Sequence, residues 1–148
     1  MIAVASDHGG FDLKQEVMAF LEEKGYEYKD FGCYDKKSVD YPDYARTVAD
    51  KVLSKEAEFG ILICGTGIGI SIAANRIPGI RAALCSECFS AQATREHNNA
   101  NILALGGRTV GPEVAKKIVE TFLETPFSQD ERHQRRIDGI EGKASGQQ

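Results

Sequence analysis

The chain has 148 residues, with 18 Lys and Arg against 22 Asp and Glu, so its formal net charge is −4. This length fits a single domain that can bury a core without disulfides or a metal. An acidic balance disfavours nucleic acid, which binds a basic face. No apolar run approaches the roughly 18–20 residues of a membrane span, and the first residues lack the pattern of a secretory signal. With four irregularly spaced, reduced cysteines, we expect a cytoplasmic protein that acts on a small molecule.

Five short apolar segments predict five β-strands, at residues 2–6, 26–31, 59–64, 80–85 and 102–105. The segment 59–64 is apolar on both faces, as a central parallel strand must be. Helical patterns separate the strands, and this alternation predicts an α/β fold with a parallel sheet between helices on both faces.

The helices are expected from apolar residues at helical spacing, with Gly25 ending the first and Pro42 in the first turn of the second. We expect one domain over residues 1–138 and a flexible tail over 139–148. The predicted buried positions are Leu13, Val17, Phe20 and Leu21 in the first helix, Ala45, Val48, Ala49, Val52 and Leu53 in the second, and Val114, Ile118, Val119 and Phe122 in the long helix after Gly111-Pro112.

Residues 64–69, Cys-Gly-Thr-Gly-Ile-Gly, join a predicted strand to a predicted helix. Glycines leave backbone N–H groups free at a helix N-terminus, where they can bind an anion. The same end of the helix favours the thiolate form of Cys64. A thiolate beside an anion hole suits proton transfer at a carbon next to a carbonyl, and Thr66 could hydrogen-bond the sulfur. Most free cysteines are core residues, but the position of Cys64 before the glycine loop favours a function.

The same loop does not form a dinucleotide-binding fingerprint. A Gly-x-Gly-x-x-Gly pattern starting at Gly65 requires glycine at position 70, which is Ile70. That fingerprint also belongs after the first strand of its unit, which this loop does not follow. The sequence therefore argues against a dinucleotide at this loop.

Asp7 and His8 follow the first predicted strand and precede two glycines, which let the backbone approach a ligand. Asp7 could instead only cap the next helix. Because a cap does not explain the adjacent His8, we favour a functional role for the pair.

His97 starts a run rich in asparagine that precedes the last predicted strand, and Arg108 follows that strand. A histidine among amides suits acid–base chemistry on a hydroxylated substrate. Equally, the asparagines could form a turn and His97 could end a helix. Both interpretations stay open from spacing alone.

Arg132 and Arg136 are four residues apart, so they share a helix face and could bind one phosphate. Such a run of charges is more often a solvated face. Cys85 and Cys88 form a C-x-x-C pair, but neither further zinc ligands nor a thioredoxin-like context accompanies it. We expect these two cysteines to pack, and Cys33 has no evident partner.

Together these motifs resemble the type B ribose-5-phosphate isomerases, which form one sugar-phosphate isomerase family with the galactose-6-phosphate isomerase subunits. The resemblance extends from about residue 1 to residue 137. It implies a Rossmann-like three-layer α/β/α fold, a homodimer with sites at the subunit interface that could pair further into a tetramer, and no metal or other cofactor. The residues that carry it are 6–10, 40–42, 64–69, 73–75 and 97–101.

The resemblance also implies roles for individual residues. Cys64 matches the base that moves a proton between C1 and C2 through a cis-enediolate, and Thr66 matches its hydrogen-bond partner. His97 matches the residue that opens the furanose ring. The remaining matches are the enediolate hole at Gly65, Gly67, Ile68 and Gly69, the sugar ligands Asp7, Asp40, Tyr41 and Asn98, and the phosphate ligands His8, Arg108, Arg132 and Arg136.

One branch of the family has a glutamate base where this chain has Ile70, so the resemblance assigns the chain to the cysteine-base branch. The implied reaction interconverts ribose 5-phosphate and ribulose 5-phosphate in the non-oxidative pentose phosphate pathway. One alternative is an isomerase of a 6-phosphohexose such as allose or galactose 6-phosphate. Another is a non-catalytic phosphosugar-binding regulator, which would need neither Cys64 nor His97.

Overall fold

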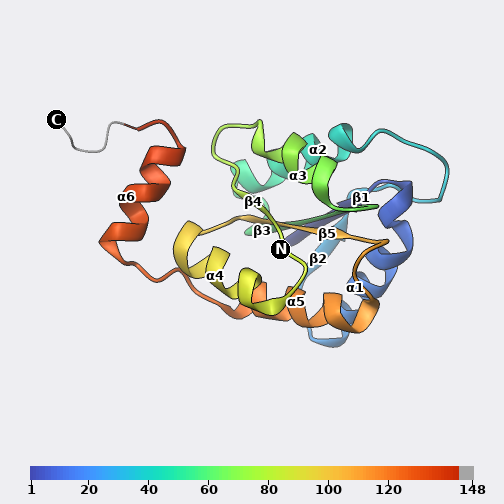
Figure 1. Ribbon diagram of the computed structural model, residues 1–148. Coiled ribbons are helices and arrows are strands. Elements are labelled where there is room, and N and C mark those ends of the chain that lie inside the picture. The colour runs from blue at the N-terminus through green and yellow to red at the C-terminus, as the bar shows by residue number, and fades with distance from the viewer. Residues whose placement is uncertain (144–148) are drawn as a thin grey trace.

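The computed structural model describes residues 1–143, which form a five-stranded parallel sheet between two layers of helices (Figure 1). The strand order is β2-β1-β3-β5-β4, with all neighbouring pairs parallel. The predicted α/β class is therefore confirmed. The strands are β1 (Ile2–Ser6), β2 (Tyr28–Asp30), β3 (Phe59–Cys64), β4 (Ala82–Leu84) and β5 (Ile102–Gly106), and β2 and β4 are shorter than expected.

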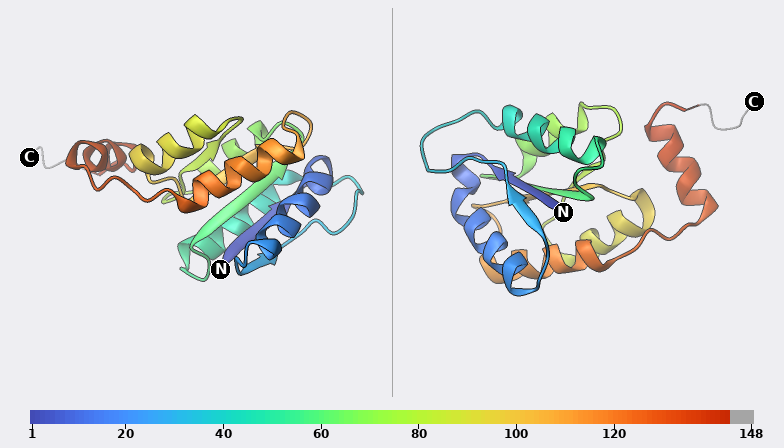
Figure 2. Two further views of the ribbon diagram at one scale, coloured as in Figure 1. Left: turned by 90° about the horizontal axis from the view of Figure 1, so that it is seen from below. Right: turned by 180° about the vertical axis from the view of Figure 1, so that it is seen from behind.

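The helices cover both faces of the sheet, and the view from behind shows one layer on each side of it (Figure 2, right). One layer contains α1, α4 and α5, and the other contains α2 and α3. A short 3₁₀ turn, His8–Gly10, precedes the first helix. The helices are α1 (Phe11–Glu23), α2 (Tyr41–Leu53), α3 (Ile68–Asn75), α4 (Cys88–Asn98), α5 (Pro112–Glu124) and α6 (Glu131–Ile140).

The central strand β3 shows why the sheet is covered on both sides. Successive side chains of a strand point to opposite faces, and here both sets are apolar. Ile61 and Ile63 pack into the α1 and α5 layer, whereas Leu62 and Cys64 pack into the α2 and α3 layer. Burying each large aliphatic side chain contributes about 1.5–3 kcal/mol. The same alternation fixes the direction in which Cys64 leaves the sheet.

Two predicted core positions are wrong. Leu53 is 42% exposed and Val114 is 48% exposed. Each residue of a helix is turned by about 100° from the one before it. Leu53 therefore rotates away from the sheet one step after the buried Val52, and Ala115 takes the inward position next to Val114.

Strands β1 and β3 are neighbours at the point where the connections between strands change direction. From β1 the chain passes to β2 on one side, and α2 then carries it to β3 on the other side. Ser6 and Ile63 are in register at the carboxyl ends of these strands. A reversal of this kind opens a crevice at the carboxyl ends, where α/β proteins bind their ligands.

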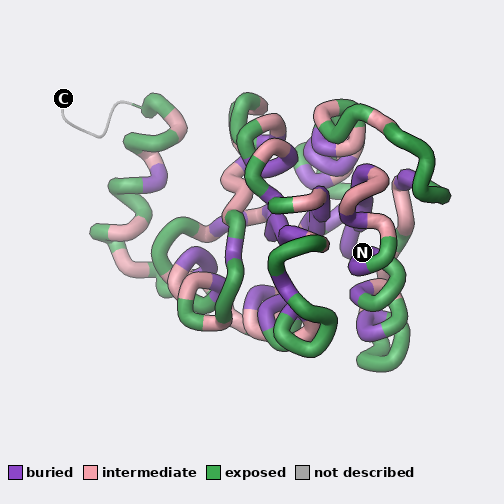
Figure 3. The backbone as a smooth tube through the Cα atoms, turned by 45° about the vertical axis from the view of Figure 1, so that its right-hand side comes forward, coloured by how far each residue is buried: buried purple, intermediate pink, exposed green. Residues whose placement is uncertain are grey.

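Helix α6 lies to one side of the sheet and packs against α4 (Figures 1 and 2). Among its residues only Ile137 is buried, and the burial map shows mostly exposed and intermediate positions along it (Figure 3). The helix continues through Gly139 and Ile140, which we expected in the tail. Residues 144–148 of that expected tail lie outside the described part of the chain.

Within residues 1–143 no helix is long and apolar enough to cross a membrane.

Candidate active site

Cys64 is the last residue of β3 and its side chain is almost buried. The chain turns immediately through Gly67, whose φ of +79° is a left-handed conformation that glycine adopts without strain. This turn aims the Gly67 N–H at the sulfur, with a distance of 3.1 Å from nitrogen to Sγ. A backbone donor and the adjacent N-terminus of α3 both stabilise negative charge on the sulfur.

Thr66 differs in detail from its expected role. Its Oγ1 accepts a hydrogen bond from the Ile68 N–H at 3.1 Å, and the Gly67 N–H takes the place expected for it at the sulfur. The N–H groups in the first turn of a helix have no intrahelical acceptor. In this loop the Gly67 and Ile68 N–H groups are bonded to Cys64 and Thr66, so the predicted anion hole would use the N–H groups of the first turn of α3 that follow them.

Glycines allow the loops after β1, β3 and β5 to meet backbone to backbone. A Cβ on Gly10 would lie 2.4 Å from the Ile63 oxygen, and one on Gly107 would lie 2.7 Å from the Gly9 oxygen. A Cβ on Gly9 would lie 3.1 Å from the Gly65 nitrogen. The three loops are therefore one packed unit around the end of β3.

Asp7 and His8 sit in this unit with different roles. The Asp7 Oδ1 accepts the Gly10 N–H at 3.1 Å, so its carboxylate does cap the 3₁₀ turn. His8 Nδ1 accepts the Val39 N–H at 3.2 Å. Because an amide can only donate, Nδ1 is the unprotonated ring nitrogen and Nε2 carries the hydrogen. His8 is thus oriented as a donor.

Asp40 and Tyr41 border the unit from the start of α2. The Tyr41 ring packs on Gly69, where an added Cβ would lie 2.5 Å from the ring. Sequence patterns did not indicate Arg46, whose only signal is its place one helical turn after Pro42. Asp40, Tyr41 and Arg46 line one cavity of about 620 Å³. Its lining residues are Asp7, His8, Ser38, Val39, Asp40, Tyr41, Pro42, Asp43 and Arg46.

Arg108 reaches the same place from the loop after β5. Its N–H donates to the Gly65 oxygen at 2.9 Å, and the Gly107 N–H donates to the Cys64 oxygen at 2.8 Å. Its Nη1 lies 3.1 Å from the position of a Cβ on Gly65. One chain therefore assembles a strand-end group, which comprises Asp7, His8, Asp40, Tyr41, residues 64–69 and Arg108.

The structure does not bring His97 and Asn98 to this group. They end α4, which runs from the carboxyl end of β4 back to the amino end of β5. Gly60, near the start of β3, pairs with Ile102, whereas Cys64 pairs with Gly106 at the far end. At about 3.3 Å per residue, the two ends are roughly 13 Å apart along the strand. The run from His97 precedes β5, so it lies at the amino end of that strand.

Arg132 and Arg136 lie on α6, on the same side of the molecule as His97. The ring of His133 packs on that of His97, with centroids 4.5 Å apart. Arg132 is within 3.4 Å of Asp130, and its side chain is 58% exposed. We call His97, Asn98, Arg132 and Arg136 the helix-end group, which two contacting helices carry.

Two other residues that the sequence brings into question, Ile70 and Cys85, are buried in the core. Ile70 is fully buried, so it supports the core between α2 and α3. Burial, with a smaller contribution from the charge of Glu87, raises the pKa of the Cys85 thiol to about 11. Cys85 belongs to the core beside α4, in keeping with the packing role expected for it.

Within residues 1–143 no three His, Cys, Asp or Glu side chains are grouped to hold a metal ion.

Comparisons with known proteins identify the family of the chain. Residues 2–140 match the Ribose/Galactose Isomerase family. The chain is 51% identical over 139 residues to ribose-5-phosphate isomerase B of Escherichia coli, covering 94% of this chain and 93% of that protein. It is 54% identical over 140 residues to a putative sugar phosphate isomerase of Bacillus subtilis, with the same coverage. The solved ribose 5-phosphate isomerase of Thermotoga maritima superposes with a TM-score of 0.93 at 57% identity, covering 95% and 97% of the two chains.

The loops after β1, β3 and β5 meet at the switch point of the parallel sheet, which is where α/β proteins bind small ligands. This chain belongs to the Ribose/Galactose Isomerase family of sugar-phosphate isomerases.

Proposed function

We propose that this chain interconverts D-ribose 5-phosphate and D-ribulose 5-phosphate. The observation that carries the proposal is the Cys64 thiol, which receives the Gly67 N–H at 3.1 Å beside the open N-terminus of α3. Proton transfer at a carbon next to a carbonyl needs such a base with an adjacent anion hole. The ribose 5-phosphate isomerase names of relatives at 51–57% identity support the five-carbon substrate.

The reaction begins with ring opening, in which His97 accepts the proton of the C1 hydroxyl and returns a proton to the ring oxygen. The Cys64 thiolate then removes the proton from C2, and the electron pair forms the C1–C2 double bond of a cis-enediolate. Backbone N–H groups of residues 65–69 stabilise the charge on the enediolate oxygen. A proton moves from O2 to O1, and return of the proton from the Cys64 thiol to C1 gives the ketose, so no external oxidant or reductant is needed.

The phosphate does not react, and it serves to position the sugar. His8 donates through Nε2, and Arg108, Arg132 and Arg136 supply positive charge. Asp7, Asp40, Tyr41 and Asn98 contact the sugar hydroxyls. Binding energy from the phosphate holds the reacting carbons against the thiolate. This set needs both the strand-end group and the helix-end group.

Two copies of the chain complete the site. Within one chain Cys64 lies at the carboxyl ends of the strands, whereas α4 brings the helix-end group to their amino ends. The proposed reaction therefore requires the partner to supply the helix-end group. Exposed apolar side chains of α3, β4 and α4 suit burial in a symmetric homodimer. They are Ile68, Ile72, Leu84 and Phe89, with exposures of 51%, 59%, 41% and 78%.

The four cysteines are free thiols, which suits a reducing compartment such as the cytoplasm. There the reaction would serve the non-oxidative pentose phosphate pathway, as the family resemblance implies.

One assay tests the proposal. Purified chain is given ribose 5-phosphate, allose 6-phosphate and galactose 6-phosphate in parallel, with and without EDTA. We expect the highest kcat/KM on ribose 5-phosphate and the same rate with EDTA. A higher value on a 6-phosphohexose would replace the substrate, and no turnover of any sugar phosphate would leave a binding protein.

A further inference from the structure

Arg81 lies just before β4 and outside every motif that predicts the site. Its side chain is 17% exposed. Its Nε donates to the Asn98 oxygen at 2.8 Å and its Nη2 to the Asn99 oxygen at 3.0 Å. Carbonyls at the end of a helix have no intrahelical donor. Arg81 therefore satisfies two successive carbonyls at the end of α4, next to His97.

The same guanidinium also holds α6. Its Nη1 lies 3.1 Å from Oε1 of Glu141, the C-cap residue that directly follows α6. The other carboxylate oxygen, Oε2, accepts the Gly79 N–H at 3.2 Å. Both charged side chains are largely shielded from water, which strengthens the ion pair relative to an exposed one. Arg81 thus joins the ends of the two helices that carry the helix-end group.

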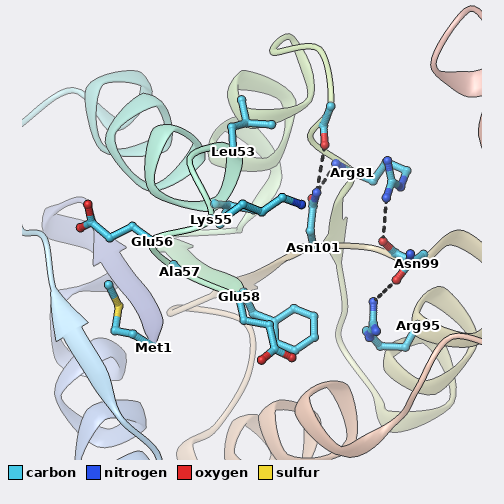
Figure 4. A pocket seen from close by; sticks show the side chains of 13 residues that line it. Met1, Leu53, Lys55, Glu56, Ala57, Glu58, Arg81, Arg95, Asn99 and Asn101 are labelled. Carbon is cyan, nitrogen blue, oxygen red and sulfur yellow. Dashed lines mark hydrogen bonds between the residues drawn. The ribbon is translucent and has the colours of Figure 1, made fainter.

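A second arginine supports the shared end of α4. Asn99 has φ and ψ of +45° and +45°, a left-handed conformation that is uncommon outside glycine. Its side-chain Oδ1 accepts the Arg95 Nη1 at 2.8 Å, and the same Nη1 donates to the Ala100 oxygen at 2.7 Å. Arg81 and Arg95 bracket Asn99 from two sides (Figure 4).

Where Arg81, Arg95 and Asn99 face a cavity, hydrogen bonds rather than packed neighbours hold their side chains in place. Arg81, Arg95 and Asn99 line a cavity of about 610 Å³, together with Asn101 and Lys55 (Figure 4). Side chains next to open space depend on directional bonds for their geometry. Loss of one such bond is therefore expected to release the helix ends without opening the core.

We propose that Arg81 and Glu141 are positioning residues, which hold the ends of α4 and α6 so that the helix-end group reaches the substrate as one preformed unit. This inference rests on the proposed function. A loose α6 would have to be ordered each time phosphate binds, and that ordering weakens binding. Loss of the Glu141 carboxylate leaves Arg81 on the Asn98 and Asn99 carbonyls beside His97, so it releases α6 alone, and the steps at His97 and Cys64 on bound substrate are unaffected.

The test compares Glu141→Ala and Glu141→Gln with Glu56→Ala in the full-length chain. Glu56 pairs with Lys51 at 3.3 Å near the same edge of the sheet but belongs to neither α4 nor α6, so it is the matched control. We expect Glu141→Ala to raise KM for ribose 5-phosphate roughly 3- to 10-fold with kcat within about 2-fold. Glu141→Gln keeps one acceptor and recovers part of the affinity, and Glu56→Ala matches wild type.

Hydrogen exchange supplies a readout that needs no substrate. Amides of α6 are expected to exchange faster in Glu141→Ala than in Glu56→Ala, with the core strands unchanged. An unchanged KM in Glu141→Ala, or a fall in kcat and melting temperature together, overturns the positioning role while the proposed function stands. A wild-type chain inactive on every sugar phosphate overturns the proposed function whatever the exchange result.

Discussion

The strand-end group and the helix-end group are built in opposite ways. The strand-end group is made of loops that touch backbone to backbone, and a Cβ on Gly10 would already lie 2.4 Å from the Ile63 oxygen. The helix-end group sits on α6, whose only buried residue is Ile137, and on the end of α4. Chemistry at a carbon requires fixed atoms, whereas contacts to the unreactive phosphate mainly set affinity. The contrast predicts different kinetic defects for Cys64 in the strand-end group and for the arginines of α6 in the helix-end group.

The largest expected effect is in the strand-end group. Cys64→Ala removes the proposed base while leaving a small side chain in the same space, so folding should persist. We expect kcat to fall by about 10²–10⁴-fold. Steady-state assays and circular dichroism of the purified variant measure the two properties. A kcat near that of wild type would show that another group takes the proton.

Mixed dimers test whether the groups come from different chains. Cys64→Ala and His97→Ala are each expected to be nearly inactive alone. If each site uses both protomers, a mixed dimer has one intact site, and random exchange of equal amounts restores about a quarter of wild-type activity. Activity is measured after the two variants are unfolded and refolded together. No recovery, with mixed dimers present, would place both residues in one protomer's site.

The phosphate arginines of α6 should show a defect in substrate affinity. Arg132→Ala or Arg136→Ala removes one charge-assisted contact, and we expect KM to rise by about 10-fold or more with a smaller change in kcat. Arg135→Ala, on the same helix but outside the helix-end group, is the control. Equal kinetic constants in the variants and wild type would remove these arginines from the site.

The smallest expected effect is a difference in alkylation rate between two nearly buried thiols, Cys64 and Cys85. Burial raises the pKa of Cys85 to about 11, so at pH 8 it stays protonated and becomes reactive only as the pH approaches that value. Cys64 receives an N–H donor instead. Iodoacetamide at pH 8 should modify Cys64 at least about 10-fold faster, as mass spectrometry of peptides would measure. Preferential labelling of Cys85 would contradict the assigned environments.

The sequence predicts the fold well because each strand and helix has a strong local pattern. The run of apolar residues at 59–64 predicts β3 with the bounds that are found. Errors fall at helix ends such as Leu53, where one residue of rotation decides burial. Similarly, Cys64 and its loop are predictable because a strand, a glycine turn and a helix are consecutive in sequence.

Other features of the site depend on tertiary contacts that no local pattern encodes. His97 is spatially remote from Cys64 because an 11-residue helix returns the chain to the amino edge of the sheet. Its position before the last predicted strand was the available signal. The bond from Val39 to His8 and the pairing of Arg81 with Glu141 join residues 31 and 60 positions apart, so spacing could not indicate them.

The outlying position of α6 has a consequence for how the protein would behave on dilution. Under the proposed arrangement an isolated chain folds fully and yet has only part of a catalytic site. Specific activity would then depend on protein concentration, falling as dimers dissociate while the folded content stays constant. Catalysis would then require two chains to associate, so the protein concentration would itself control the flux through the reaction.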